Sequence, residues 1–171
     1  MKFKEIKKKD LQLNPVKLFA EDWPLLTAGN DEDGYNVMTI AWGHIGAIWN
    51  KPTITVYVRP QRYTKEFVDC NELFTVSVLP SEYKEVLAYL GQASGRDEDK
   101  VGKANITPIF DKKTTYFEES ELVFICRKVY QAQIENEGFQ EQSLSDTVYP
   151  EKDFHTMYIG EIVEILQRSK T

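Results

Sequence analysis

Apolar residues along this chain gather in short runs rich in β-branched and aromatic side chains, a composition typical of β-strands. Turn-forming residues separate the runs, most clearly between Asn30 and Tyr35. The runs predict strands at residues 23–29, 36–49, 53–58, 73–79, 121–134 and 154–166. Strands therefore dominate the predicted structure.

Helical spacing of apolar residues occurs only in shorter segments between the strands. The clearest helix is predicted at residues 81–91, with Ser81 as its N-cap and Gly91 as its end. Its apolar stripe consists of Tyr83, Val86, Leu87 and Leu90. Residues 62–70 and 97–103 predict two further short helices.

The order of these elements favours a mainly β fold with capping α-helices. Strands outnumber helices and do not alternate with them as βαβ units require, so an antiparallel barrel fits better than a doubly wound sheet. Closure into a barrel would also hide the edges of apolar strands. A chain of 171 residues is predicted to form a single domain, residues 1–171, with residues 1–20 as an N-terminal arm.

Charge and composition narrow the functional class. Lys and Arg number 21 against 27 Asp and Glu, a formal charge of −6 that argues against a nucleic-acid partner. No run approaches the ~18 apolar residues of a membrane span, and the first residues lack the apolar core of a signal peptide. Cys70 and Cys126 form no CxxC pair. These features predict a cytoplasmic protein with no membrane contact and reduced cysteines.

Familiar catalytic and nucleotide-binding motifs are missing from the sequence. It contains neither G-x-G-x-x-G nor the P-loop pattern. His44 and His155 do not have the spacing of a zinc-binding helix, so no metal site is predicted. If the chain is an enzyme, a bound cofactor is expected to supply the reactivity.

Two segments combine positive charge, hydroxyl groups and turn-forming residues, which suits an anion such as phosphate. The first runs from Arg59 to Thr64, between a predicted strand and a predicted helix. The second runs from Ser94 to Lys100. The alternative is structural: a proline turn with an N-cap threonine and surface arginines in the first, and charge balance between basic and acidic residues in the second.

The segment NVMTIAWG, Asn36 to Gly43, has one face of large residues and one of small residues. Thr39, Ala41 and Gly43 form the small face, on which a planar ring could lie close to the backbone. The alternative is close packing of a helix or strand on the small residues.

An ordered series of motifs spans roughly Trp23 to Leu166. In chain order they are Asn36-x-Met38-Thr39-x-Ala41-Trp42-Gly43, Lys51-Pro52, Arg59-Pro60-x-Arg62-Tyr63-Thr64, Ser94-Gly95-Arg96-x-x-Asp99-Lys100 and His155-x-x-x-Ile159-Gly160-Glu161-Ile162. Together they resemble the flavin reductase-like, FMN-binding split-barrel family, and within it the flavoredoxin-like branch. The resemblance implies a split β-barrel homodimer that binds FMN near the subunit interface.

The same resemblance assigns roles to individual residues. Ring and ribityl contacts are implied for Asn36, Met38, Thr39, Ala41 and Trp42. Phosphate contacts are implied for Arg59, Tyr63, Thr64, Ser94, Gly95, Arg96 and Lys100. Gln61 and Arg62 are expected to point to solvent. Replacement of Arg59 by Ala is then expected to weaken the binding of FMN more than that of riboflavin.

His155 is the catalytic candidate that the resemblance implies, with a structural histidine as the alternative. Many family members carry Gly-Asp-His before the last strand, whereas this chain has Asp153-Phe154-His155. The implied function is transfer of electrons from NAD(P)H through FMN to free flavin, a redox protein or another acceptor. Two alternatives are an FMN-binding electron carrier without nicotinamide activity and a domain that serves only protein interaction.

Overall fold

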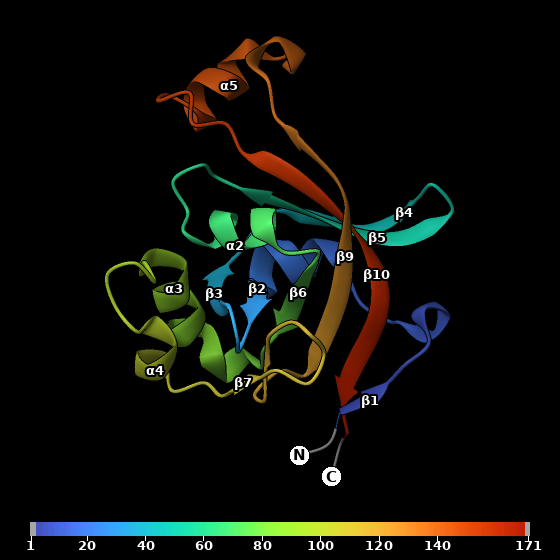
Figure 1. The fold of residues 1–171 in the computed structure, drawn as a ribbon. Coiled ribbons are helices and arrows are strands. Elements are labelled where there is room, and N and C mark those ends of the chain that lie inside the picture. The colour runs from blue at the N-terminus through green and yellow to red at the C-terminus, as the bar shows by residue number, and fades with distance from the viewer. Residues whose placement is uncertain (1–2, 170–171) are drawn as a thin grey trace.

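The computed structural model describes residues 3–169 and is mainly β, as the sequence predicts (Figure 1). Its main sheet is antiparallel and has the strand order β3-β2-β6-β9-β10-β5-β4, with β1 paired to β10. These strands are β1 (Phe3–Glu5), β2 (Leu25–Asn30), β3 (Gly34–Thr39), β4 (Gly43–Ile48), β5 (Lys51–Val58), β6 (Leu73–Val78), β9 (Leu122–Gln133) and β10 (Thr156–Arg168). A small second sheet pairs β7 (Pro108–Ile109) with β8 (Tyr116–Phe117).

Helices are short and lie in the connections between strands. The α-helices are α1 (Pro15–Lys17), α2 (Thr64–Cys70), α3 (Lys84–Gln92), α4 (Lys100–Ala104) and α5 (Gln142–Val148). Single turns of other helix types are η1 (Lys8–Asp10), η2 (Leu18–Asp22), η3 (Ser81–Tyr83) and η4 (Asn136–Gly138). Within residues 3–169, no helix has the length and apolarity needed to cross a membrane.

The predicted helix at residues 81–91 is present, but its two predicted ends are wrong. Ser81 lies in the separate turn η3 and its side chain makes no capping hydrogen bond, because α3 begins only at Lys84. Gly91 lies inside α3, which continues to Gln92. The reason for a glycine there is packing: a Cβ at this position would lie 3.3 Å from the Cβ of Thr39 on β3.

Strands β9 and β10 form the long axis of the molecule (Figure 1). Register shifts occur in their pairing between Ile159 and Gly160 and between Ile162 and Glu164. Such bulges increase the local twist. The first half of β10 therefore pairs with β5, whereas its end pairs with β1. The connection between β9 and β10, residues 134–155, is called the excursion below; it carries α5 and extends beyond the sheet at one end (Figure 1).

The predicted strand 36–49 is in fact two strands on opposite edges of the sheet. β3 pairs with β2 at one edge, whereas β4 pairs with β5 at the other, so residues 40–42 carry the chain between the two edges. Trp49 and Asn50 form the turn into β5 with positive φ angles of 53° and 57°. This is the backbone shape of the tight hairpin turn that matches the twist of paired strands.

Both faces of β2 and β3 are buried, which places β3 between two apolar clusters. Leu26 and Met38 point into the main core, with Val56, Phe74 and Tyr158. Their neighbours Leu25 and Val37 point the other way, against Leu87 and Leu90 of α3. This alternation follows from the two-residue period of a strand. One end of β3 is thereby fixed beside α3, where the polar loops meet.

Candidate functional site

Two loops that are distant in sequence meet beside β3 and enclose a small polar pocket. Asn36 on β3 donates through Nδ2 to Oγ1 of Thr64 at the start of α2, over 2.9 Å, and both residues are buried. The pocket has a volume of about 110 Å³. Its lining consists of Asn36, Gln61, Arg62, Tyr63, Thr64, Gln92, Ala93, Ser94 and Lys100. The two segments that the sequence predicts to bind an anion therefore contribute to one pocket.

Two positive charges meet at this pocket. Lys100 is only 3% exposed, and its Nζ donates to the carbonyl oxygens of Ala93 (3.1 Å) and Leu90 (3.4 Å). Burial, and secondarily the charge of Arg62, lowers the pKa of Lys100 to about 8, against an opposing effect of Glu98. In the described part of the chain no carboxylate lies within ion-pair distance of either cation.

Arg62 points into the protein, so the expectation that it faces solvent is wrong. Its Nη2 donates to the carbonyl oxygen of Gly91 over 2.7 Å, and burial lowers the pKa of its guanidinium. The reason is the turn that precedes it: the Arg62 amide donates to the Arg59 carbonyl across Pro60, which reverses the chain toward α3. Gln61, in contrast, is exposed as expected.

Gly95 allows the second loop to approach β3 closely. A Cβ at this position would lie 2.3 Å from Oδ1 of Asn36 and 3.3 Å from the ring of Tyr63. Any larger residue would displace the loop from the pocket. The glycine is thus explained by close packing of the backbone at the site.

Arg96 covers the outer side of Tyr63. Its guanidinium carbon lies 4.6 Å from the centre of the Tyr63 ring, and its Nη2 pairs with Glu66 of α2. Its Nη1 donates to the carbonyl oxygen of Gln61 over 3.3 Å. These contacts join the two loops, and Arg96 is not part of the pocket lining.

Arg59 belongs to a different cluster, at the base of the excursion. Its Nη1 pairs with Asp153, its Nη2 donates to the carbonyl oxygen of Val148 (3.0 Å), and its guanidinium carbon lies 5.2 Å from the centre of the Tyr149 ring. Gln61 also donates to Asp153, over 2.8 Å. The hydrogen bonds from Gln61 and Arg59 lower the pKa of the Asp153 carboxyl.

His155 lies in the same cluster and contacts Trp42. Its Nδ1 is 2.8 Å from the hydroxyl of Tyr149, and its ring centre is 4.9 Å from that of Trp42. The histidine is only 7% exposed. Burial, and secondarily the charge of Arg59, lowers the pKa of His155 to about 4, against an opposing effect of Asp153. His155 is therefore neutral at pH 7, and its Nδ1 shares a hydrogen bond with the hydroxyl of Tyr149.

Trp42 stands at the wall of a large, mainly apolar cavity of about 630 Å³. The indole is 48% exposed, although its inner side rests on His155. The lining consists of Pro15, Val16, Phe19, Ala20, Ala41, Trp42, Gly43, His44, Ile45, Tyr57 and Ile134. Tyr57 and His44 form its polar edge, with Oη and Nδ1 3.2 Å apart.

The residues predicted to contact the flavin ring are spread over several environments. Asn36 lines the polar pocket, whereas Ala41 and Trp42 line the apolar cavity. Met38 lies in the main core, and Thr39 donates to the Leu87 carbonyl oxygen over 2.5 Å. The small face of the strand is thus covered at Thr39 by helix α3, which is the structural alternative that the sequence left open. Ring contacts for these residues stay predictions.

Sequence reasoning brought Tyr63, Thr64, Ser94 and Lys100 to one pocket but missed the roles of two other groups. Arg62 belongs to the first predicted anion-binding segment, but the direction of its side chain was not predicted, because a residue after a turn has no period that fixes its direction. Tyr149 and Asp153 were not identified, since the excursion shows no regular apolar pattern. A metal-binding role finds no support among residues 3–169, which hold no cluster of three or more His, Cys, Asp or Glu side chains.

Comparison with known proteins identifies a matching family and solved structures with a similar fold. The family described as flavin reductase like domain matches residues 17–171. No curated protein matches the chain. Flavoredoxin of Desulfovibrio vulgaris (Miyazaki F) is 22% identical with a TM-score of 0.68, over 96% of this chain and 77% of that one.

Two further solved structures share the fold. An FMN-binding domain of a flavin reductases-like enzyme from Shewanella baltica OS155 has 14% identity and a TM-score of 0.67, over 97% of this chain and 77% of that one. A Shewanella frigidimarina NCIMB 400 protein with a split barrel domain has 17% identity and a TM-score of 0.67, over 95% and 77%. The split-barrel fold predicted from the sequence is therefore confirmed, and this chain belongs to the flavin reductase-like domain family.

Proposed function

We propose that this chain binds FMN and is an oxidoreductase that passes electrons from NAD(P)H to free flavin, a redox protein or another acceptor. One observation carries the proposal: β3 and residues 40–42, which follow it, connect a doubly cationic polar pocket to an apolar cavity. Asn36 and Ala41, at these two ends, are at most about 16 Å apart, the length of an extended chain over five residues. A phosphorylated, elongated molecule with a flat ring matches this arrangement.

The polar pocket has the chemistry that a phosphate requires. Lys100 and Arg62 supply two charges that lack carboxylate partners within the described residues, and burial, with the charge of Arg62 second, lowers the pKa of Lys100. An anion between them would relieve this repulsion. Asn36, Thr64 and Ser94 add uncharged polar groups. The pocket therefore fits the phosphate end of FMN, and the cavity at Trp42 fits its ring.

When bound, FMN supplies the hydride and single-electron chemistry. The residues of this chain provide binding and environment. Lys100 and Arg62 hold the phosphate, and the apolar wall at Trp42 excludes water from the ring. His155 stays neutral beside Trp42, so it contributes a hydrogen-bonding group without a charge. In this proposal no side chain has to act as a nucleophile.

A spectrum and a titration test the proposal. We expect purified protein to take up FMN, to absorb between about 350 and 500 nm, and to bind FMN at micromolar strength or better, because three or four charge-assisted hydrogen bonds provide that much. Addition of NADH or NADPH without oxygen should bleach the flavin. If FMN neither binds nor raises the melting temperature, the proposal is wrong.

An FMN-binding electron carrier is the second candidate, favoured by the lining of the cavity at Trp42. This lining contains no lysine or arginine that could pair with the phosphates of a nicotinamide dinucleotide. Protein that holds FMN but is not bleached by either nicotinamide would identify the carrier.

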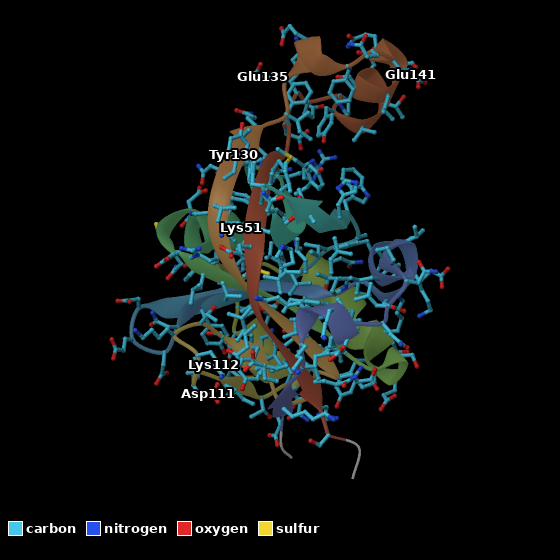
Figure 2. All side chains as sticks on the ribbon, turned by 90° about the vertical axis from the view of Figure 1, so that its right-hand side faces the viewer. Lys51, Asp111, Lys112, Tyr130, Glu135 and Glu141 are labelled. Atoms are coloured by element: carbon cyan, nitrogen blue, oxygen red, sulfur yellow. The ribbon has the colours of Figure 1, made fainter. Side chains whose placement is uncertain are left out.

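We also propose a homodimer, supported by exposed apolar side chains. They include Val16, Trp42, Ile48, Trp49 and Leu144. The ring centres of Trp49 and Tyr130 are 6.0 Å apart. Tyr130 lies on the same outer face as Lys51 (Figure 2). Such groups commonly mark contact surfaces. Light scattering after size exclusion measures the mass, and a monomer at micromolar concentration would contradict the dimer.

A further inference from the structure

The geometry points to Arg59 as a positioning residue that clamps the excursion to the end of β5 and thereby holds Trp42 at the wall of the apolar cavity. This differs from the phosphate contact that the sequence predicts for Arg59. It deepens the proposed function, since Trp42 lies where the ring of the cofactor is proposed to bind, but the clamp itself does not depend on FMN.

The contacts of Arg59 involve both terminal nitrogens of its guanidinium. Nη1 pairs with Asp153 and Nη2 donates to the carbonyl oxygen of Val148, while the guanidinium carbon lies 5.2 Å from the centre of the Tyr149 ring. All three partners belong to the returning part of the excursion. The fixed fork of arginine suits two simultaneous acceptors, which the single ammonium of lysine cannot reproduce. Arg59 therefore binds the excursion through both terminal nitrogens and is not directed toward the polar pocket.

The excursion needs such an anchor because it extends beyond the paired part of the sheet. Figure 1 shows α5 at the end of the molecule, away from α3 and α4, and Figure 2 shows Glu135 and Glu141 on this outlying segment. The long strands pair to Thr156 and Gln133, beyond which the Ile134 amide still donates to the His155 carbonyl. Beyond that point, side chains such as Arg59 fix the returning segment.

The clamp reaches Trp42 through two residues of the returning segment. Tyr149, beside the guanidinium, holds Nδ1 of His155 over 2.8 Å, and His155 supports the indole at a ring separation of 4.9 Å. The other side of Trp42 is open to the cavity. Movement of the returning segment would therefore remove the support beneath a half-exposed indole.

Arg62 provides a matched control within the same turn. It lines the polar pocket and donates to the Gly91 carbonyl, whereas Arg59 is outside that lining. The two arginines are joined by the hydrogen bond from the Arg62 amide to the Arg59 carbonyl. One turn thus presents two arginines to two different sites.

The experiment uses Trp42 fluorescence and flavin selectivity together. Trp23→Phe and Trp49→Phe leave Trp42 as the single tryptophan, since the chain has three. In this background we expect Arg59→Ala to raise acrylamide quenching of Trp42 about twofold, because its support is loosened. FMN and riboflavin affinities should change by the same factor. Arg62→Ala should leave Trp42 quenching unchanged and weaken FMN about tenfold or more relative to riboflavin.

Each result decides the inference. A selective loss of FMN affinity in Arg59→Ala, or unchanged Trp42 quenching, would overturn it. If Arg59→Ala does not fold, Arg59→Lys replaces it, and a quenching value between those of wild type and Asp153→Asn is expected. Wild-type protein that fails to bind FMN would overturn the proposed function, while the quenching of apoprotein would still decide the role of Arg59.

Discussion

Lys100→Met is expected to lower the affinity for FMN about 100-fold and to leave riboflavin affinity near its wild-type value. Among the residues that the structure describes, the buried Lys100 donates only to carbonyl oxygens. Its burial costs desolvation energy, and an anion that binds beside it offsets this cost. Met has a similar length and no charge. We therefore expect the free energy of unfolding of the apoprotein to stay within about 1 kcal/mol of wild type. Fluorescence titrations with both flavins and urea denaturation measure these quantities.

The pH dependence of FMN affinity provides a second test of the role of Lys100. The pKa of Lys100 is lowered to about 8, so the free lysine loses its charge as the pH rises through that value. FMN affinity of the wild type should fall between pH 7 and pH 9, whereas Lys100→Met should show no such fall. Lys103→Met is the control, because Lys103 is exposed and paired with Glu98. A comparable loss of FMN affinity in Lys103→Met would contradict a specific role for Lys100.

Acid should destabilise the wild type more than a His155→Asn variant. The pKa of His155 is lowered from 6.5 to about 4, so between these values the unfolded chain binds a proton that the folded chain does not. The contribution of neutral His155 to the free energy of unfolding is therefore fully present above pH 6.5 and is lost as the pH falls toward 4. Each pKa unit corresponds to about 1.4 kcal/mol, so the free energy of unfolding falls by up to about 3 kcal/mol.

Asn is chosen because its amide, like a neutral imidazole, offers Tyr149 both a donor and an acceptor but does not titrate. Urea denaturation of both proteins at several pH values between 7.5 and 4.5 measures the difference. Carboxylates contribute equally to both proteins, so the difference isolates His155. Parallel curves over the whole range would show that His155 accepts a proton as readily in the folded state as in the unfolded state.

The sequence predicted the parts of this fold that depend on local pattern. The run TITVYV became β5, and Leu87 and Leu90 became the buried side of α3, because burial of alternate or helically spaced residues is a local property. It also identified the two loops that meet at the polar pocket, since glycine, hydroxyl and arginine residues concentrate there. Their meeting depends on tertiary packing, because α2 packs with Met38 in the main core and α3 packs with Val37 on the other face of β3.

Side-chain direction was the part that local pattern could not supply. Arg59 and Arg62 are both arginines in one loop, and only the turn at Pro60 decides which of them faces the pocket. Similarly, an unbroken strand would place the large residues Met38, Ile40 and Trp42 on one face, but β3 ends at Thr39 and Trp42 is half exposed. The excursion has no regular apolar period, so its contact with Trp42 arises only in three dimensions.

The turn from Arg59 to Arg62 has a consequence for how this protein can change over evolutionary time. Substitution of either arginine leaves the neighbouring backbone intact. Anion binding by Arg62 and anchoring of the excursion by Arg59 can therefore be lost or changed independently. An insertion or deletion between them would alter the spacing of both at once. We therefore expect related proteins to differ in this turn by point substitutions and not by insertions or deletions.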